Sequence, residues 1–403
     1  MWNVILLGLV SLLADISSEM VYPIIPLYLV AVGAGPATLG LIEGSAEMLA
    51  SLTGVASGRR SDRTGRRKPL ALLGYGLSAI GKLLLALGGG WPSVLAGRLT
   101  DRFGKGIRGA PRDALLADSV DAPHRGRAFG LHRAMDTTGA LLGVLLAYAI
   151  VTAATHPTAA TYLRVFALAV APGVGSAALL MFARERRRAV TAEGAPASQP
   201  RAAGRLQAIV GAWSQLDGRL KAFLLVALLF TLGNSSNQFL LLRAGQLGES
   251  SGGVLLLYGF YNFVYALLAY PAGRLSDRIG RRALLVAGYS VYGLVYLGFA
   301  LVRGTPALWP LFGLYGAYTA FTDGVQKALL VDLAPPDLKA TLIGLHATVV
   351  GLALLPASLL AGLLWDRLGP PAPFLFGGVA GLLAALALWA VLARPRAGNR
   401  IPM

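Results

Sequence analysis

Hydrophobic residues run in long, nearly uninterrupted stretches along this chain, separated by short polar turns. About 20 predominantly apolar residues suffice for a helix to cross a bilayer. The pattern predicts twelve such helices, at residues 3–31, 37–57, 69–88, 92–117, 128–153, 160–183, 220–243, 253–272, 283–302, 307–332, 340–364 and 373–393. We therefore expect an all-α polytopic membrane protein.

Composition supports this class. Of the 403 residues, 55% are hydrophobic and only 14% are charged, whereas about a quarter of the residues of soluble domains are charged. The first segment is too long for a signal-peptide core, so we expect it to stay in the mature protein. The chain has no cysteine, which excludes disulfides and thiolate metal sites. We expect no metal site, no cofactor and no enzymatic activity.

The net charge of +17 is distributed unevenly among the turns. Arginine and lysine gather in the turns on the side of the N-terminus, and few lie in the opposite turns. This positive-inside pattern predicts that both termini are cytoplasmic. A nucleic-acid-binding protein would instead gather its basic residues on one contiguous face, so we expect a lipid bilayer and no nucleic acid as partner. We also expect a monomer.

The second half of the chain repeats the first. The basic segment Gly58–Arg67 returns as Gly273–Arg282, and Ala114–Asp118 resembles Ala328–Asp332. The repeat predicts a six-helix half at 1–183, a cytoplasmic linker at 184–218 and a second six-helix half at 219–403. Within the linker, residues 205–213 are amphipathic enough for an interfacial helix. Two parallel repeats of this kind are typical of secondary transporters.

These features resemble the major facilitator superfamily. The doubled pattern G-x-x-x-D-R-x-G-R-R is similar to the family's motif A, and Arg98 stands where the family has the arginine of its motif B. Residues 104–113 resemble a prokaryotic branch of efflux permeases, some linked to nickel export. The resemblance implies the twelve-helix fold of two pseudo-symmetric halves and, for a bacterial protein, location in the inner membrane.

The chain also departs from the family. Asp101 and Arg102 replace a usual Gln and Gly of motif B, which disfavours a purely hydrophobic drug pocket. Val144 stands where the antiporter motif C has proline, so that motif gives incomplete support for antiport.

The resemblance implies a gate at the cytoplasmic end. Asp62 is expected to meet the start of the 340–364 helix, and Asp277 the start of the 128–153 helix, because an aspartate stabilises free N–H groups at a helix N-terminus. Arg63 or Arg66 is expected to pair with Asp118, and Arg278 or Arg281 with Asp332. The alternative is that these basic residues only set the topology. The predicted gating residues are Gly58, Asp62, Arg63, Gly65, Arg66, Asp118, Gly273, Asp277, Arg278, Gly280, Arg281 and Asp332.

Charged residues inside the predicted spans concentrate in the first half. Asp15 and Glu19 lie one turn apart in the first span, and Glu43 and Glu47 repeat that spacing in the second. Charges within a membrane are costly and usually face a cavity or a partner. These acids are candidates for proton coupling or substrate binding; alternatively, they neutralise the basic residues of the 92–117 span.

The 92–117 span carries a charged stripe on one helical face. It could bind an anionic substrate group, but we favour a role as counter-charge for the four acids. His132 and Asp136 in the next span form a candidate proton relay, although the repeat of His132 as His346 also fits inherited architecture. The stripe consists of Arg98, Asp101, Lys105, Arg108 and Arg112, and Arg102 lies next to it.

The second half offers amides and phenols in place of the acids. Such groups recognise a substrate without titrating, although they could equally form hydrogen bonds between helices. The predicted polar wall consists of Asn234, Asn237, Tyr258, Tyr261, Asn262, Asp323 and Lys327.

The leading hypothesis from the sequence is a secondary transporter that works by alternating access and exports a small molecule or cation against protons. Export of a divalent metal such as nickel is one alternative, since Asp15, Glu19, Glu43 and His132 could supply ligands. Proton-coupled nutrient uptake and a non-transporting membrane sensor are the others.

Overall fold

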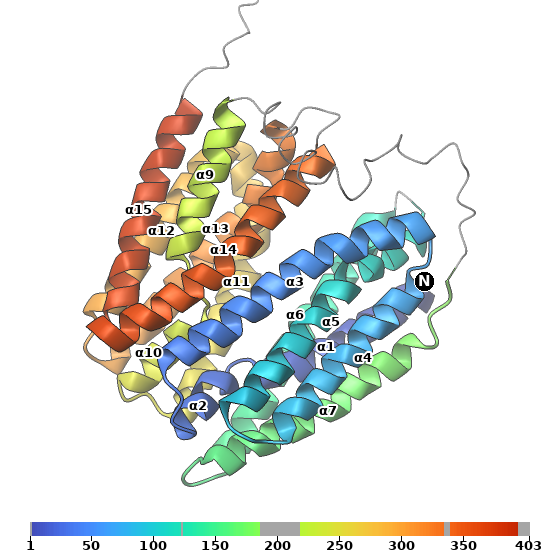
Figure 1. Cartoon of the computed structure of the whole chain (residues 1–403). Coiled ribbons are helices and arrows are strands. Elements are labelled where there is room, and N and C mark those ends of the chain that lie inside the picture. The colour runs from blue at the N-terminus through green and yellow to red at the C-terminus, as the bar shows by residue number, and fades with distance from the viewer. Residues whose placement is uncertain (1, 122–123, 186–217, 334–338, 394–403) are drawn as a thin grey trace, which may run out of the picture.

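The structure is a computed structural model that describes residues 2–121, 124–185, 218–333 and 339–393. The elements found in these ranges are helices, without any strand (Figure 1). Of the predicted linker, only Arg184, Glu185 and Gly218 are described, and the proposed interfacial helix lies outside the described residues.

Two six-span halves make up the bundle. The first half consists of α1 (Trp2–Val21), α2 (Ile24–Ala31), α3 (Pro36–Thr64), α4 (Lys68–Ala86), α5 (Trp91–Asp118), α6 (Arg125–Thr152) and α7 (Ala159–Leu180). The second half consists of α9 (Gly218–Gly233), α10 (Gln238–Gln246), α11 (Ser251–Ile279), α12 (Arg281–Leu301), the short 3-10 helix η4 (Thr305–Ala307), α13 (Leu308–Leu333), α14 (Lys339–Leu368) and α15 (Ala372–Ala393).

The twelve predicted spans are confirmed, with two of them broken. The first span divides into α1 and α2 at Tyr22 and Pro23, and the seventh divides into α9 and α10 at residues 234–237. Proline lacks the N–H that an intrahelical hydrogen bond needs, and its ring clashes with the preceding turn. Pro23 therefore accounts for the first break.

Hydropathy alone identifies fewer spans. In the described ranges, nine segments are long and apolar enough to cross a membrane. The helices α3, α5 and α13 are not among them, because their polar residues and glycines lower the local hydropathy. The sequence pattern nevertheless predicts all three as spans, and each forms a helix of at least 26 residues.

The basic motifs differ from the expected short turns. Gly58–Thr64 form the last two turns of α3, and Gly273–Ile279 form the end of α11. Each helix ends at a glycine with positive φ, 61° at Gly65 and 91° at Gly280, a conformation that glycine adopts without steric cost. The motif therefore extends these helices; the turn that follows consists of residues 65–67 in the first copy and of Gly280 alone in the second.

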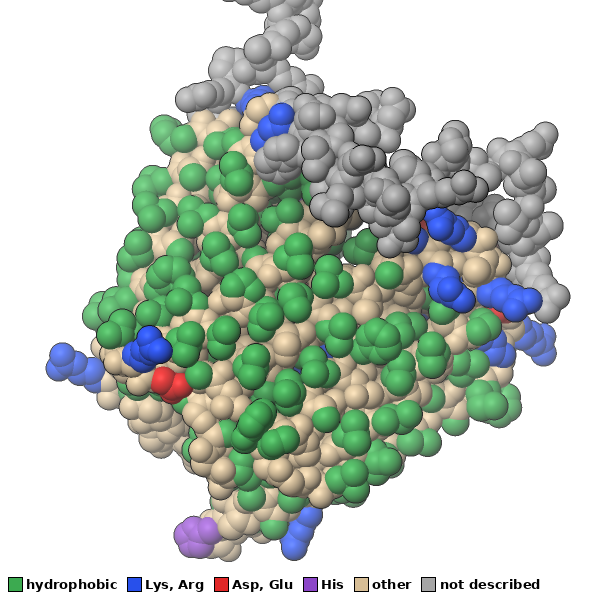
Figure 2. Space-filling model, in the orientation of Figure 1, with side chains coloured by type: hydrophobic (Ala, Val, Ile, Leu, Met, Phe, Trp, Pro, Cys, Tyr) green, Lys and Arg blue, Asp and Glu red, His purple; other side chains and the backbone are tan. Residues whose placement is uncertain are grey.

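The bundle surface matches a lipid environment. Large apolar side chains are exposed on most helices, with Leu168 54%, Leu294 61% and Leu386 64% exposed. Figure 2 shows hydrophobic side chains across the middle of one face, with lysine and arginine gathered toward its edges. This is the distribution that a bilayer requires.

The two halves meet most closely along α3 and α14, which lie side by side (Figure 1). The Ala37 N–H donates to the Asp366 carboxylate at 3.0 Å, and the Ser51 hydroxyl donates to the Ala347 carbonyl at 3.0 Å. Beyond Ser51, α3 contacts α5, where the Ser57 hydroxyl donates to the Ile107 carbonyl at 2.5 Å. The halves therefore approach at the end opposite the basic motifs.

Small residues permit this approach. A Cβ added at Gly40 would lie 2.1 Å from the Ser358 carbonyl oxygen, whereas one added at Gly76 in α4 would have no neighbour within 4 Å. We expect Gly40→Ala to force α3 away from α14 and to destabilise the protein by about 1–3 kcal/mol, seen as a lower midpoint of thermal unfolding in detergent. Gly76→Ala, the matched control, should be neutral or slightly stabilising. Equal midpoints for the two variants would contradict the packing described.

Candidate transport site

A buried ion pair links α5 to α3. Arg98 donates from Nε to Glu43 Oε1 at 2.6 Å and from Nη2 to Glu43 Oε2 at 2.7 Å. The two side chains are 2% and 0% exposed. Two parallel charge-assisted hydrogen bonds satisfy both carboxylate oxygens of Glu43 and hold its plane. Glu43 is therefore committed to Arg98 in this conformation.

A second buried pair joins α4 to α5. The Lys82 ammonium lies 2.5 Å from Asp101 Oδ1, and Arg98 Nη1 lies 3.5 Å from Asp101 Oδ2. Lys82 also donates to the Ser18 hydroxyl at 3.1 Å. Four charged groups on three helices thus neutralise one another inside the first half.

The next turn of α5 continues this pattern of ion pairs with α3. Arg102 Nε lies 3.3 Å from Glu47 Oε1, and the Glu47 side chain is 38% exposed. The guanidinium groups of Arg98 and Arg102 lie 5.5 and 5.9 Å from the centroid of the Tyr22 ring, which is within cation–π range. The helix break at Tyr22 is therefore in contact with the charged stripe.

The remaining members of the stripe have different surroundings. Arg108 is buried, with its guanidinium 4.3 Å from the centroid of the Tyr75 ring. Arg112 contacts Asp113 at 2.9 Å and the Ser11 hydroxyl at 3.2 Å. Lys105 is exposed. The predicted counter-charge role thus describes Arg98 and Arg102 but does not extend to the whole stripe.

The acids of α1 are not engaged by the stripe in the same way. Glu19 accepts a hydrogen bond of 2.6 Å from the Tyr258 hydroxyl of α11, so this contact crosses between the halves. Asp15 is partly buried, and no hydrogen bond or ion pair of Asp15 is found among the described residues. Of the acids that the sequence singles out, these two have no basic partner within bonding distance in the described chain.

His132 and Asp136 lie together on α6. His132 Nδ1 is 3.5 Å from Asp136 Oδ2, and both side chains are largely buried. His346 instead contacts Gln326 at 2.9 Å and stacks on Phe223. The repeated histidines therefore have different surroundings, and the relay predicted for His132 stays a prediction.

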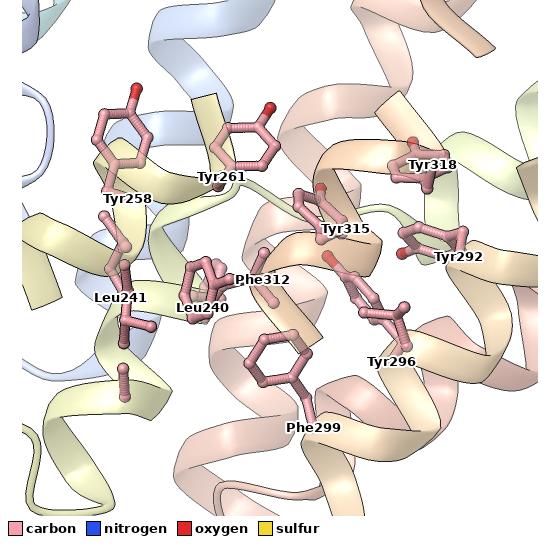
Figure 3. Close-up of a cluster of buried hydrophobic side chains, with 14 of the residues drawn as sticks. Leu240, Leu241, Tyr258, Tyr261, Tyr292, Tyr296, Phe299, Phe312, Tyr315 and Tyr318 are labelled. Atoms are coloured by element: carbon pink, nitrogen blue, oxygen red, sulfur yellow. The ribbon is translucent and has the colours of Figure 1, made fainter. Parts of the chain in front are cut away.

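Phenols from three helices surround the break between α9 and α10 (Figure 3). The Asn234 amide donates to the Tyr318 hydroxyl at 3.2 Å, and the Tyr315 hydroxyl donates to Asn237 Oδ1 at 2.7 Å. Asn237 also donates to the Tyr261 hydroxyl at 3.4 Å. The structure thus brings Asn234, Asn237 and Tyr261 into one cluster.

The other residues of the predicted polar wall are more dispersed. Asn262 donates to the Tyr258 carbonyl of its own helix at 3.0 Å. Asp323 accepts from the Tyr265 hydroxyl at 2.9 Å, and Arg133 of the first half donates to the same hydroxyl at 3.2 Å. The Lys327 side chain lies outside what the structure describes.

The predicted gate is only partly visible. Asp118 pairs with Arg67, where the sequence predicts Arg63 or Arg66, and those two side chains are exposed. Arg281 Nη1 lies 2.8 Å from Asp332 Oδ2, as predicted.

Asp62, Asp277 and Arg278 are exposed. Several side chains at the start of α14 are not described, so the contact expected of Asp62 stays a prediction.

Sequence reasoning missed two parts of the site. Lys82 was overlooked, although a lysine within an apolar span is itself the signal of a buried partner. The tyrosines of α12 and α13, Tyr292, Tyr296, Tyr315 and Tyr318, were also overlooked. Their spacing of three or four residues, which places them on one helical face, could have found them.

The family is established by comparison with known proteins. A model of the Major Facilitator Superfamily matches residues 7–242 and 223–402. Over 392 residues the chain is 38% identical to an uncharacterized MFS-type transporter of Methanocaldococcus jannaschii, covering 96% of this chain and 94% of that protein. The chain belongs to the major facilitator superfamily, a family of membrane transporters.

Two further similarities concern part of the chain or the fold alone. Over 165 residues the chain is 29% identical to the class C tetracycline resistance protein of Escherichia coli, covering 40% of each. The fold is similar to that of a variant of the nucleoside transporter NupG, with a TM-score of 0.81 and 13% identity over 96% of this chain and 99% of that one.

The charge network leads to a test of its structural role. Removing one member of a buried ion pair leaves an uncompensated charge and costs about 3–5 kcal/mol. We therefore expect Asp101→Asn, which leaves Lys82 without its carboxylate, to lower the midpoint of thermal unfolding in detergent markedly. The exposed Asp113→Asn is the matched control and should change it little. A double variant, Lys82→Met with Asp101→Leu, should recover part of the loss; wild-type stability of Asp101→Asn alone would contradict this account.

Proposed function

We propose that this protein is a proton-coupled exporter of a small molecule or cation that works by alternating access, with Glu19 as its principal proton-carrying group. The observation that carries the proposal is the hydrogen bond between Glu19 and Tyr258. It joins the two halves, and Glu19 has no basic partner within bonding distance in the described chain. Glu43 and Asp101, in contrast, are held by buried cations.

Protonation of Glu19 would change that contact. An ionised carboxylate accepts a charge-assisted hydrogen bond from the Tyr258 hydroxyl, and such bonds are about twice as strong as neutral ones. Once protonated, Glu19 makes only a neutral bond there, so the halves are held together less firmly. A proton and a change in the contact between halves are thereby linked, which coupled transport requires.

The arrangement of the two halves bears on the direction of transport. If the basic motifs are cytoplasmic, as the positive-inside pattern predicts, the close contacts of α3 with α14 seal the outer side, and this conformation faces inward. The partial similarity to tetracycline resistance proteins favours export. The location in a cell membrane with both termini cytoplasmic belongs to the same proposal.

Metal export receives less support. Among the described residues, no three of His, Asp and Glu come close enough to hold a metal ion. Of the ligands that the sequence suggested, Glu43 is held by Arg98, and His132 lies against Asp136. We therefore do not extend the proposal to nickel-type export or to nutrient uptake.

A growth assay tests the proposal. An efflux-deficient bacterial host expressing this protein would be exposed to graded tetracycline, tetraphenylphosphonium, nickel and cobalt. We expect raised tolerance to at least one compound, and its loss in Glu19→Gln, because the amide cannot carry a proton. Everted vesicles loaded with a pH indicator should then show proton movement with that compound in the wild type only.

The control for this experiment makes the same chemical change elsewhere. Glu249 lies in the loop between α10 and α11. We expect the Glu249→Gln variant to keep full tolerance at equal expression. Tyr258→Phe should weaken transport without abolishing proton binding. Full activity of Glu19→Gln would disprove the coupling role, and no change in tolerance or proton movement for any compound would overturn proton-coupled export.

The gate gives a second, independent prediction. The chain has no native cysteine, so Lys105→Cys, at an exposed position of α5, can report access of a membrane-impermeant maleimide from the cytoplasm. If Asp62 stabilises the outward-facing state by roughly 1 kcal/mol at a helix N-terminus, Asp62→Asn should raise the ratio of inward-facing to outward-facing molecules about fivefold, seen as faster cytoplasmic labelling. Asp121→Asn, also exposed at that end, should have no effect. Equal labelling of both variants would remove the gating role of Asp62.

A further inference from the structure

The break between α9 and α10 has no proline to explain it. No proline occurs between Gly218 and Gln246, yet residues 234–237 leave the helix within the bundle. Backbone groups released inside a membrane are costly unless other groups satisfy them. Ser235 is 6% exposed and Gln238 is 0% exposed, so the polar groups of these two residues need partners inside the protein. Asn234, Ser236 and Asn237 are partly exposed.

Phenols satisfy only part of the break. The Tyr292 hydroxyl donates to the Gly233 carbonyl at 2.8 Å, and the Tyr315 hydroxyl donates to Asn237 Oδ1. Two amide oxygens remain buried without a hydrogen-bond partner among the described residues, namely Asn234 Oδ1 and Gln238 Oε1. The unused amide oxygens are acceptors, which points to a ligand that is a donor or a cation.

The chemistry of these groups limits further which kind of ligand could bind. Oxygen ligands suit hard cations, but no Asp or Glu lies between Gly218 and Gln246 to balance a divalent charge. Amide oxygens do not bind protons near neutral pH, so a proton is not the occupant. The carbonyl end of α9 also points into the break, and the negative end of a helix dipole favours a cation.

We propose that the α9/α10 break binds a monovalent alkali cation, with Asn234 Oδ1 and Gln238 Oε1 as ligands and the Gly233 carbonyl beside them. The bound ion would compensate the broken helix. This site lies in the second half and goes beyond the proton coupling proposed for Glu19.

The site has a physical connection to the first half. Gln238 donates from Nε2 to the Tyr22 carbonyl at 3.3 Å, so the two helix breaks are in contact. The Tyr22 ring in turn lies beside Arg98 and Arg102. A cation that orders Gln238 would therefore strengthen a contact between the halves close to the charge network.

Thermal unfolding of the purified full-length protein tests the site. Measurements in choline chloride, with Na⁺, Li⁺ or K⁺ replacing choline at constant ionic strength, separate specific binding from general salt effects. A ligand that binds only the folded state raises stability with the logarithm of its concentration above Kd. We expect a saturable rise in the unfolding midpoint with at least one alkali cation.

Variants assign the effect to the break. Asn234→Leu, which keeps the approximate shape but removes the oxygen, should lose the cation response. Asn234→Asp should shift the response to about tenfold lower cation concentration, because added ligand charge raises affinity. Asn262→Leu, the same change at an amide that is bonded within its own helix, should leave the response intact. If Asn234→Leu does not fold, the shift in cation concentration expected for Asn234→Asp still tests the proposal.

Three outcomes would overturn the proposal. Identical midpoints in all four salts would mean that water alone satisfies the break. An unchanged cation response in Asn234→Leu, or no concentration shift in Asn234→Asp, would place any bound ion elsewhere. The test is independent of proton coupling, because Glu19→Gln should retain the cation response whether or not it transports.

Discussion

The pairing of charges on α5 is the constraint on which the first half of this protein depends. A bilayer offers no water to a buried guanidinium or carboxylate, so each charge needs a partner from another helix. Arg98 takes Glu43 from α3, and Asp101 takes Lys82 from α4. These pairs fix the spacing and rotation of three helices that hydropathy alone would leave undetermined.

The same pairing selects which acids remain for chemistry. Glu43 and Asp101 are occupied by cations, whereas Glu19 reaches the other half through Tyr258. A carboxylate enclosed by fixed cations holds its charge and stabilises structure. In the mechanism that we propose, a carboxylate whose partner is a neutral phenol of the other half changes protonation and thereby alters the contact between the halves. On that proposal, the carboxylates that stabilise the structure and the one that carries a proton are different residues.

The two halves share a fold but differ in their interior chemistry. Both contain a broken first helix, and Gln238 and Tyr22 bring the breaks into contact. In the first half, the break adjoins arginines; in the second, it is surrounded by tyrosines from α11, α12 and α13 (Figure 3). The helix arrangement is thus repeated in the two halves, whereas their interior polar side chains differ.

The sequence by itself determined the twelve spans, the repeat and the family. Hydrophobicity of a span and charge of a turn are local properties, and a basic motif repeated at the ends of the second and eighth spans is readable without knowing any contact. Only the tertiary structure decided that Arg67 rather than Arg63 or Arg66 meets Asp118, that Lys82 completes the network, and that Gly58–Thr64 continue a helix. The partner of a buried charge depends on how separate helices are rotated and placed, and hydropathy along one segment carries no information about that.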